Sequence, residues 1–393
     1  MKPWDLPIIP RISPVRILTP TIYLALKDCP LRGVWSANGV SSSLPIAPKA
    51  ALGMVIHKVI EGAWKGNIYS TDDFEKSWEE SLQLVEANLV RSWAGRHFVP
   101  LEYSVRRYAL KKELCKKTIK KILESQMRFG PLVTAQNINN CKSSNRHRLK
   151  VGQEIRLSTP SGSITGVADN IIVTENQIQI VDYKSAYWEK ADSCDAHKEK
   201  FEQYCIQLFF YAALYHSQHK VWPDSLVLAT IGGNEIRIPY APREAANVLL
   251  DAKLMLSQIN CLIRKSMMLS VGATMSRLAK PSHVNCRYCQ YRPLCTPYWN
   301  RTVGENDNWP ADLVGRIIRK GCWGDEKIFV ELSLTETGKK ATIIDLTPGR
   351  HPAIEENNLG VAIFSLTKGK KDDGIYKENP FTTIYCIKKR DMT

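Results

Sequence analysis

Several features that would restrict the setting of this protein are missing from its 393 residues. No stretch of eighteen apolar residues occurs, so we expect no transmembrane helix. The opening residues, MKPWDLPIIPRISPVR, lack the apolar core and cleavage site of a secretory signal peptide. No G-x-x-x-x-G-K-[ST] loop is present, which argues against a P-loop motor in this chain. We therefore expect an intracellular, cytoplasmic protein that does not span a membrane.

Acidic residues are scarce relative to basic ones. The chain has 54 Lys and Arg against 39 Asp and Glu, a formal net charge of +15. Such an excess favours a polyanionic partner, nucleic acid before an anionic membrane, with plain solubility as the alternative. Clustering favours the nucleic acid, because basic residues gather in NRHRLK at 145–150 and in a predicted helix over 105–129. The lysines of that helix are Lys111, Lys112, Lys116, Lys117, Lys120 and Lys121.

Helical and strand periodicities alternate along the first three quarters of the chain. Helical patterns cover residues 49–64, 71–93, 105–129, 198–215 and 242–265, and TPTIYLALKDCPLRGVW is expected as one short helix. Residues 152–185 predict three strands joined by the turns TPSGS and TENQ. The sequence therefore predicts an α/β fold with a mixed sheet flanked by helices.

Short β-type runs separated by Gly, Asp, Asn and Pro follow residue 300 and predict a separate all-β module. We therefore divide the chain into 1–300 and 301–393. Five short strands suit an OB-like barrel, a fold that often binds single strands, and an SH3-like or other small barrel is the alternative. Trp323, Arg316 and Arg319 are either DNA contacts or ordinary surface and core residues.

Charged residues interrupt the apolar strands in GVADNIIVTENQIQIVDYKS, residues 166–185. Alternation places Asp182 and Lys184 on one face of their strand and Tyr183 on the other, and Asp169 is expected at the end of the preceding strand. Two adjacent carboxylates repel unless a proton or a cation joins them, and Mg²⁺ or Mn²⁺ suits such oxygen ligands. Lys184 would orient a water or offset charge on a phosphate. A strand-end Asp182–Lys184 salt bridge is the alternative.

These residues belong to an ordered set of motifs. GMVIH precedes GVAD and VDYK, and QLFFY follows them. The set resembles the RecB-like branch of the PD-(D/E)xK nuclease superfamily over about residues 14–299. The resemblance implies a restriction-endonuclease-like core with His57, Asp169 and Asp182 as metal ligands and Lys184 as the catalytic lysine. Gln207 and Tyr211 would support the lysine or contact the DNA backbone.

Some of these assignments have ordinary structural alternatives. His57 lies on a mostly apolar helix, where a histidine is commonly packed. Gln207 and Tyr211 are i,i+4 neighbours in a stripe that includes Tyr204 and Tyr215, and such a stripe is commonly core. Glu154 opens the first predicted strand and is either a further ligand or a solvated side chain.

Eleven cysteines without a secretory signal argue against a disulfide framework. CRYCQYRPLC contains Cys286, Cys289 and Cys295, and three thiolates so close suit zinc or an iron–sulfur cluster with a fourth ligand. Cys29 in KDCPLRG is the candidate for that position, and His283 is the alternative. One cysteine before the nuclease core and three after it resemble the iron–sulfur members of the RecB-like branch, which include AddB-type nuclease subunits and CRISPR-adaptation exonucleases. The resemblance implies a structural [4Fe–4S] cluster, with zinc as the alternative.

Together these observations predict a Mg²⁺- or Mn²⁺-dependent DNA nuclease that acts as an exonuclease on DNA ends or single strands. Its setting would be DNA repair, recombination or defence. Because the chain lacks a motor, we expect a helicase or another repair or defence subunit as a partner. A catalytically silent DNA-binding or assembly subunit is the alternative function. A redox sensor is a third option, but no nearby cofactor motif supports it.

Overall fold

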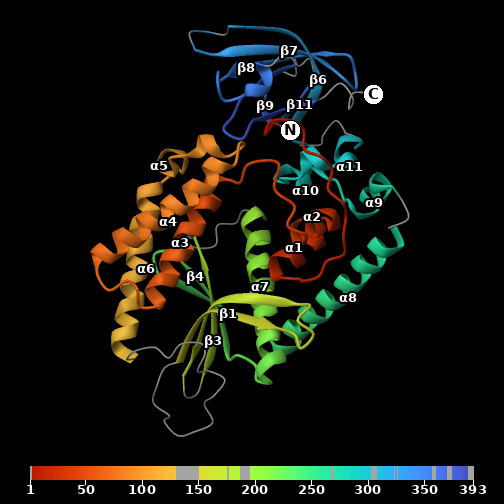
Figure 1. The fold of residues 1–393 in the computed structure, drawn as a ribbon. Helices are drawn as coiled ribbons and strands as arrows, with labels where there is room; N and C mark the ends of the chain where they lie inside the picture. Colours follow the sequence, from red (N-terminus) through yellow and green to blue (C-terminus); the bar gives the residue numbers. More distant parts are fainter. Residues whose placement is uncertain are drawn as a thin grey trace.

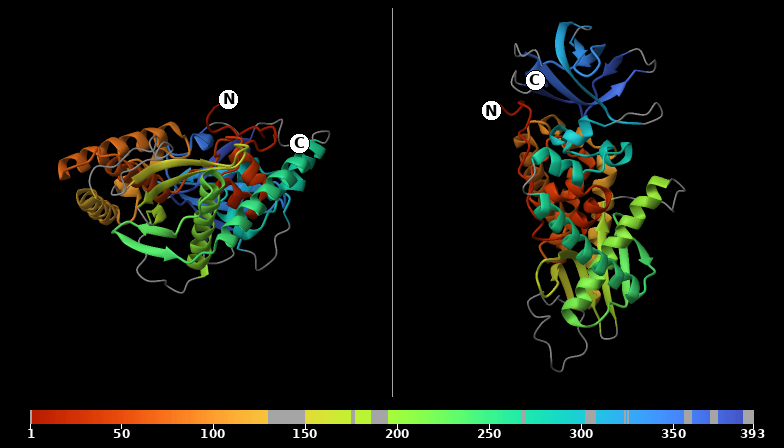
Figure 2. Two further views of the ribbon diagram at one scale, coloured as in Figure 1. Left: turned by 90° about the horizontal axis from the view of Figure 1, so that it is seen from below. Right: turned by 90° about the vertical axis from the view of Figure 1, so that its right-hand side faces the viewer.

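The computed structural model describes residues 2–129, 150–174, 177–185, 195–266, 270–301, 308–322, 324, 326–355, 360–369 and 374–387. A six-stranded sheet lies at one end of the molecule and a five-stranded sheet at the other, with helices between them (Figures 1 and 2). In the described part of the chain, no helix is both long and apolar enough to cross a membrane.

The N-terminal helical segment is divided in two, where the sequence had predicted one short helix. Helix α1 spans Pro20–Asp28 and α2 spans Pro30–Ala37. The break falls at Cys29, whose extended backbone has φ −150° and ψ 108°. Pro30 causes it, because proline disfavours the helical conformation at the preceding residue and cannot donate a helical hydrogen bond. Cys29 therefore occupies the corner between two helices.

A group of helices follows and covers one face of the five-stranded sheet. It consists of α3 (Pro48–Trp64), α4 (Thr71–Arg91), η1 (Arg96–Phe98), α5 (Leu101–Ser104) and α6 (Tyr108–Phe129). Ser70 and Asp73 form a reciprocal capping box that fixes the start of α4. The predicted apolar stripe of α3 is buried against α4 and α6, and its members are Leu52, Ile56, Val59, Ile60 and Ala63.

The five-stranded sheet has strands in sequence order, β1 (Lys150–Ser158), β2 (Thr165–Val173), β3 (Ile178–Lys184), β4 (Ser225–Thr230) and β5 (Asn234–Ile238). All neighbours are antiparallel except β3 and β4, which are parallel. Helix α7 (Asp195–His219) makes the crossover that a parallel pair requires. The three predicted strands are confirmed, and β4 and β5 were not predicted.

Alternate residues of the central strands enter two separate cores. Ile180 and Leu228 pack with α7, α1, α2 and α8 (Pro242–Ser266). Val181 and Tyr183 pack on the opposite face with α3, α4 and α6. This alternation produces the predicted mixed sheet between helical layers. The chain then continues through α9 (Val271–Leu278), α10 (His283–Arg287), η3 (Arg292–Leu294) and α11 (Thr296–Trp299).

The C-terminal sheet, called here the β module, contains one more strand than the five predicted. Its elements are β6 (Ala311–Cys322), β7 (Ile328–Leu334), β8 (Lys340–Leu346), α12 (Pro352–Glu355), β9 (Gly360–Lys368), β10 (Ile375–Lys377) and β11 (Thr383–Ile387). Strand β10 pairs with β8 in parallel and with β9 antiparallel. Strands β6 to β10 therefore form a closed ring, with β11 added beside β9.

The β module is docked on the rest of the molecule through an apolar cluster. Phe364 and Tyr385 of the module pack with Leu44, Trp93 and Trp299. The N-terminal segment adds backbone pairing to β11, because residue 6 donates its N–H to a strand carbonyl at 2.9 Å. We conclude that the β module shares a hydrophobic contact with the helical part and is not merely linked to it.

Candidate active site

Four of the predicted site residues converge from three elements. His57 of α3 places Nδ1 3.8 Å from Oδ2 of Asp169 on β2. Lys184 of β3 places Nζ 2.5 Å from Oδ2 of Asp182 on the same strand. The backbone N–H of Tyr183 donates to Asp169 Oδ2 at 2.7 Å, which ties the two strands together at the site.

Asp169 lies in the middle of β2, so the prediction that it ends its strand was wrong. The carboxylates approach each other for a different reason. The β2–β3 ladder stops at the pair Asn170–Val181, and the same register places Asp169 beside Asp182 just beyond it.

Two glycines of the sequence motifs allow close contacts around the site. A Cβ on Gly53 would stand 3.1 Å from Ser185 Oγ, so a glycine lets α3 approach the end of β3. A Cβ on Gly166 would stand 2.9 Å from Cε1 of Tyr211, so a glycine lets α7 approach β2. These contacts account for the glycines of GMVIH and GVAD.

The environment of Asp182 is suited to a bound cation. Its side chain is only 1% exposed, and burial raises its pKa to about 6 although Lys184 opposes the shift. Among the described residues no donor bonds its Oδ1. A buried carboxylate oxygen without a donor is costly, and a cation would relieve that cost.

The other two proposed ligands are also suited to a divalent ion. Burial raises the pKa of Asp169 against the Tyr183 N–H bond, and a cation would favour its ionised form. Burial and the charge of Lys184 lower the pKa of His57, so at neutral pH its imidazole is neutral, as a ligand must be. Among the described residues, no group of three or more His, Cys, Asp or Glu side chains is arranged so that it could hold a metal ion. We therefore treat these residues as a candidate ligand set.

Glu154 lies near this set, and Glu61 is an acidic neighbour that the sequence reasoning missed. The β1–β2 register places Glu154 opposite Asp169, and its backbone adopts φ +43°. Burial and the nearby Glu61 raise the pKa of Glu154. The spacing of His57 and Glu61, four residues on one helix face, was a signal that could have indicated the second acid.

Lys184 is positioned by residues of α7. Its Nζ donates to Gln207 Oε1 at 3.0 Å, and Gln207 Nε2 donates to Tyr211 Oη at 2.8 Å. The ring of Tyr204 lies 4.7 Å from Nζ. The i,i+4 stripe thus orients the lysine while Tyr211 and Tyr215 are also part of the core. The contact with Tyr204 was not predicted.

Cys29, Cys286, Cys289 and Cys295 line one small cavity, whereas His283 is not among its lining residues. Burial raises the pKa of Cys289 to about 11 and that of Cys295 to about 12. These groups are therefore thiols unless a metal replaces their protons. The donor set suits a soft metal.

Arg292 organises residues 286–295, called here the cysteine loop, and connects this loop to the β module. The side chain is 3% exposed, and its Nη1 donates to the carbonyls of Cys286 and Cys289 at 3.1 and 3.0 Å. Its Nε pairs with Asp312 Oδ2 at 2.6 Å, and Nη2 donates to Ser365 Oγ at 2.7 Å. Sequence reasoning missed this residue, although a basic residue inside CRYCQYRPLC was visible.

Some of the basic residues that the sequence singles out make contacts within the protein. Lys112 and Lys116 pair with Glu75 of α4 at 2.6 and 3.5 Å, and Lys121 donates to the Gly233 carbonyl at 2.9 Å. These three lysines therefore hold α6 against its neighbours.

In the β module, Arg319 pairs with Glu331 at 2.7 Å, and Arg316 is exposed. Trp323 and residues 145–149 lie outside the described residues.

A mixed sheet with two acids and a lysine on adjacent strands, facing a histidine on a helix, defines a hydrolytic class of site suited to a divalent ion. Residues 17–296 match the model of the PD-(D/E)XK nuclease superfamily, and the chain belongs to this superfamily. A comparison with curated proteins gave no match. Membership indicates a nuclease, a phosphodiester hydrolase whose substrate is nucleic acid, and members typically use a divalent metal.

Proposed function

We propose that this protein is a Mg²⁺- or Mn²⁺-dependent deoxyribonuclease that acts as an exonuclease on DNA ends or single strands. The observation that supports it most is Asp182, a fully buried acid with an unbonded oxygen between Asp169 and Lys184. A structural salt bridge alone would leave that oxygen unexplained. Superfamily membership supports the same reaction.

The residues of the site divide the work of hydrolysis. His57, Asp169 and Asp182 would hold the ion, which supplies Lewis-acid stabilisation of the phosphate when bound. Lys184 is aimed by Gln207 and offsets negative charge as it develops on the phosphate oxygens. Tyr211 accepts a hydrogen bond from the Gln207 amide in turn, which fixes the acceptor that orients Lys184.

The four cysteines are proposed to hold a [4Fe–4S] cluster, with a structural role typical of the RecB-like branch. Their shared cavity supports this assignment, and zinc is the alternative metal. Such a cluster would join the α1–α2 corner to the end of the nuclease region. Broad visible absorbance of anaerobically purified protein would identify iron–sulfur, whereas a colourless, zinc-containing sample would contradict it.

We also propose that residues 1–300 form the nuclease domain and that 301–393 form an OB-like domain. The closed pairing of β6 to β10, with α12 between β8 and β9, supports the OB-like assignment. We place the protein inside the cell, in DNA repair, recombination or defence. A helicase or another defence or repair subunit is the partner we expect.

The test compares cleavage by Asp182→Asn, Lys184→Met and the wild type. We expect each variant to lose at least about a hundredfold in Mg²⁺- or Mn²⁺-dependent cleavage of end-labelled DNA, because each removes charge from the reacting centre. Asp345→Asn is the matched control, because Asp345 is a partly exposed acid that pairs with Lys377 in the β module. Cleavage by both site variants at the wild-type rate would contradict the proposal.

Single-stranded, duplex and circular substrates then separate the modes of action. An exonuclease cleaves linear DNA and leaves closed circles intact. A wild-type protein that binds DNA but cleaves none of these substrates with any divalent metal would instead be the silent assembly subunit.

A further inference from the structure

A groove of about 730 Å³ lies between the cysteine loop, the N-terminal end of α3 and the β module. Five segments distant in sequence form its described walls, namely residues 44–50, 287–292, 308–311, 365–368 and 379–381. It is therefore a feature of the assembled chain and of neither sheet alone. Nothing in the proposed chemistry at Asp182 uses it.

The charged side chains that line this groove are all basic. Its described lining includes Arg287, Arg292 and Lys368 but no Asp or Glu. Arg292 is buried on Asp312, whereas Arg287 and Lys368 are exposed. Exposed cations in a concave surface without acids attract a polyanion.

Exposed aromatic rings accompany these cations. Tyr288 is 80% exposed, and the Arg287 guanidinium lies 5.4 Å from its ring centroid. Phe381, on the β-module side, is 38% exposed. Free ring faces stack on unpaired bases, whereas the bases of a duplex are already stacked on one another. The combination of rings and cations therefore favours a single strand.

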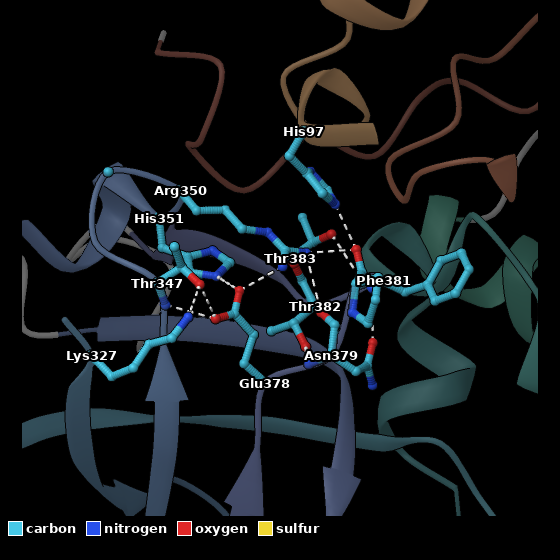
Figure 3. Close-up of polar contacts among 12 residues, drawn as sticks. His97, Lys327, Thr347, Arg350, His351, Glu378, Asn379, Phe381, Thr382 and Thr383 are labelled. Atoms are coloured by element: carbon cyan, nitrogen blue, oxygen red, sulfur yellow. Dashed lines mark hydrogen bonds and ion pairs between the residues drawn. The ribbon is translucent and has the colours of Figure 1, made fainter. Parts of the chain in front are cut away.

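The segment that carries Phe381 is held in place by a partly buried polar network (Figure 3). Arg350 Nη2 donates to the carbonyls of Asn379, Pro380 and Thr382 at 3.2, 2.6 and 3.1 Å. Its Nη1 lies 2.6 Å from Oε1 of Glu378. Figure 3 shows the Phe381 ring pointing away from this network. The ring is thus presented on a fixed backbone.

Contacts from the helical part reinforce this segment. His97 of η1 donates from Nε2 to the Pro380 carbonyl at 2.6 Å. The rings of Phe98 and Phe381 pack with centroids 5.4 Å apart. A base that stacks here would meet a preorganised surface, which lowers the entropy cost of binding.

Helix α3 connects the groove to the proposed metal site. Ala47 and Ala50 line the groove, and Gly53 and His57 follow at spacings of three and four residues. These spacings place Ala50, Gly53 and His57 on one side of the helix, with about 10 Å of rise between Ala50 and His57. A strand in the groove therefore lies roughly two helical turns from the site.

Further cations lie near α3 and the site. Burial and the positive charges of Lys49 on α3 and Lys184 on β3 lower the pKa of Lys200 on α7. Lys49 and Lys184 therefore lie close enough to Lys200 for their charges to act on it. A phosphate near Lys49 and Lys200 would offset the repulsion between their ammonium groups.

We infer that the groove is a binding site for single-stranded DNA and delivers the strand along α3 to the metal site. The bases stack on Tyr288 and Phe381, and the phosphates contact Arg287 and Lys368. The inference rests on the proposed nuclease function and names its substrate as an unpaired strand.

The test measures binding of a fluorescent oligo-dT to the full chain by anisotropy in EDTA, where no cleavage occurs. We expect Tyr288→Ala to weaken binding about tenfold, because one base–aromatic stack is lost. Tyr103→Ala is the matched control, because Tyr103 is 83% exposed on α5 and does not line the groove. Both residues are at the surface, so both variants should fold.

Charge reversal gives a second, independent arm. Lys368→Glu should weaken oligo-dT binding and reduce its salt dependence, whereas Lys253→Glu on the exposed face of α8 should not. Wild-type affinity in both groove variants would overturn the inference, as would a wild-type protein that prefers duplex to oligo-dT. Loss of cleavage in Asp182→Asn with full oligo-dT binding would separate the two sites. Failure of the nuclease proposal therefore appears in cleavage, and failure of the groove appears in binding.

Discussion

Individual residues of the site were predictable where strand alternation decides their direction. Alternation placed Asp182 and Lys184 on one face and Tyr183 on the other, as the two cores show. Alternation did not show whether Lys184 is a catalytic lysine or the partner in a salt bridge. In the structure its Nζ pairs with Asp182 and also donates to Gln207. The approach of Asp169 to Asp182 depends on where the pairing of β2 with β3 ends, and no local sequence pattern reveals that point.

The contact between Gln207 and Lys184 leads to a prediction about positioning. Gln207→Leu should lower kcat about tenfold with KM nearly unchanged, because Lys184 loses the acceptor that orients it. Steady-state kinetics on end-labelled DNA measure this. Gln83→Leu on the exposed side of α4 is the control. Equal kinetics in the Gln207 variant and the wild type would show that the contact is structural only.

Glu378 predicts a specific dependence of stability on pH. Burial opposes its ionisation, but His351, Arg350 and Thr347 outweigh burial and lower its pKa from 4.5 to about 2. An acid with a lowered folded pKa stabilises the fold above its unfolded value, and this contribution is lost as pH falls from about 4.5 to about 2.

Chemical unfolding of wild type and Glu378→Gln across this range measures the effect. The free energies of unfolding should differ by roughly 2 kcal/mol at pH 6, and the difference should shrink as pH falls through the window. Glu336→Gln, at an exposed position of the β7–β8 turn, should show little difference at any pH. A constant difference for Glu378→Gln would contradict the assigned ionisation.

At the scale of elements, long amphipathic helices and the alternating strands followed from the sequence, and short or fully buried elements did not. SLVLAT is apolar on both faces and NEIRI is only five residues long, so neither β4 nor β5 displays a distinctive period. Strand β10 has three residues and is defined only by its two partners. Pro30 indicates the break at Cys29, although one continuous helix was predicted there.

The cysteine loop and the β module are joined at the element scale by Arg292. Arg292→Met should lower the free energy of unfolding by about 3–5 kcal/mol, because the buried Asp312 loses its only cationic partner among the described residues. Arg287→Met, an exposed change in the same loop, should stay within about 0.5 kcal/mol. Urea unfolding compares the two variants. Similar stabilities would show that the buried pair does not fix the loop.

The arrangement of the whole molecule was the least predictable feature, because it depends on contacts between distant segments. Composition indicated a separate β module but not the apolar cluster that joins Phe364 and Tyr385 to Trp299. Trp299 packs against Phe364 with ring centroids 5.3 Å apart. Sequence patterns of one element carry no information about such a partner.

This cluster predicts that the module and the helical part unfold together. Calorimetry of the wild type should show one main transition, and Trp299→Ala should lower stability by about 3 kcal/mol and separate the module's unfolding from the rest. Tyr103→Ala should leave the single transition intact. Two well-separated transitions already in the wild type would contradict a shared core.

The central claim is that His57, Asp169 and Asp182 form one divalent-metal site. Titration of Mn²⁺ followed by electron paramagnetic resonance tests it without relying on cleavage. We predict that the wild type and Gln83→Leu bind Mn²⁺ and that Asp182→Asn and His57→Ala lose at least about tenfold in affinity. Unchanged Mn²⁺ affinity in both site variants would contradict the account.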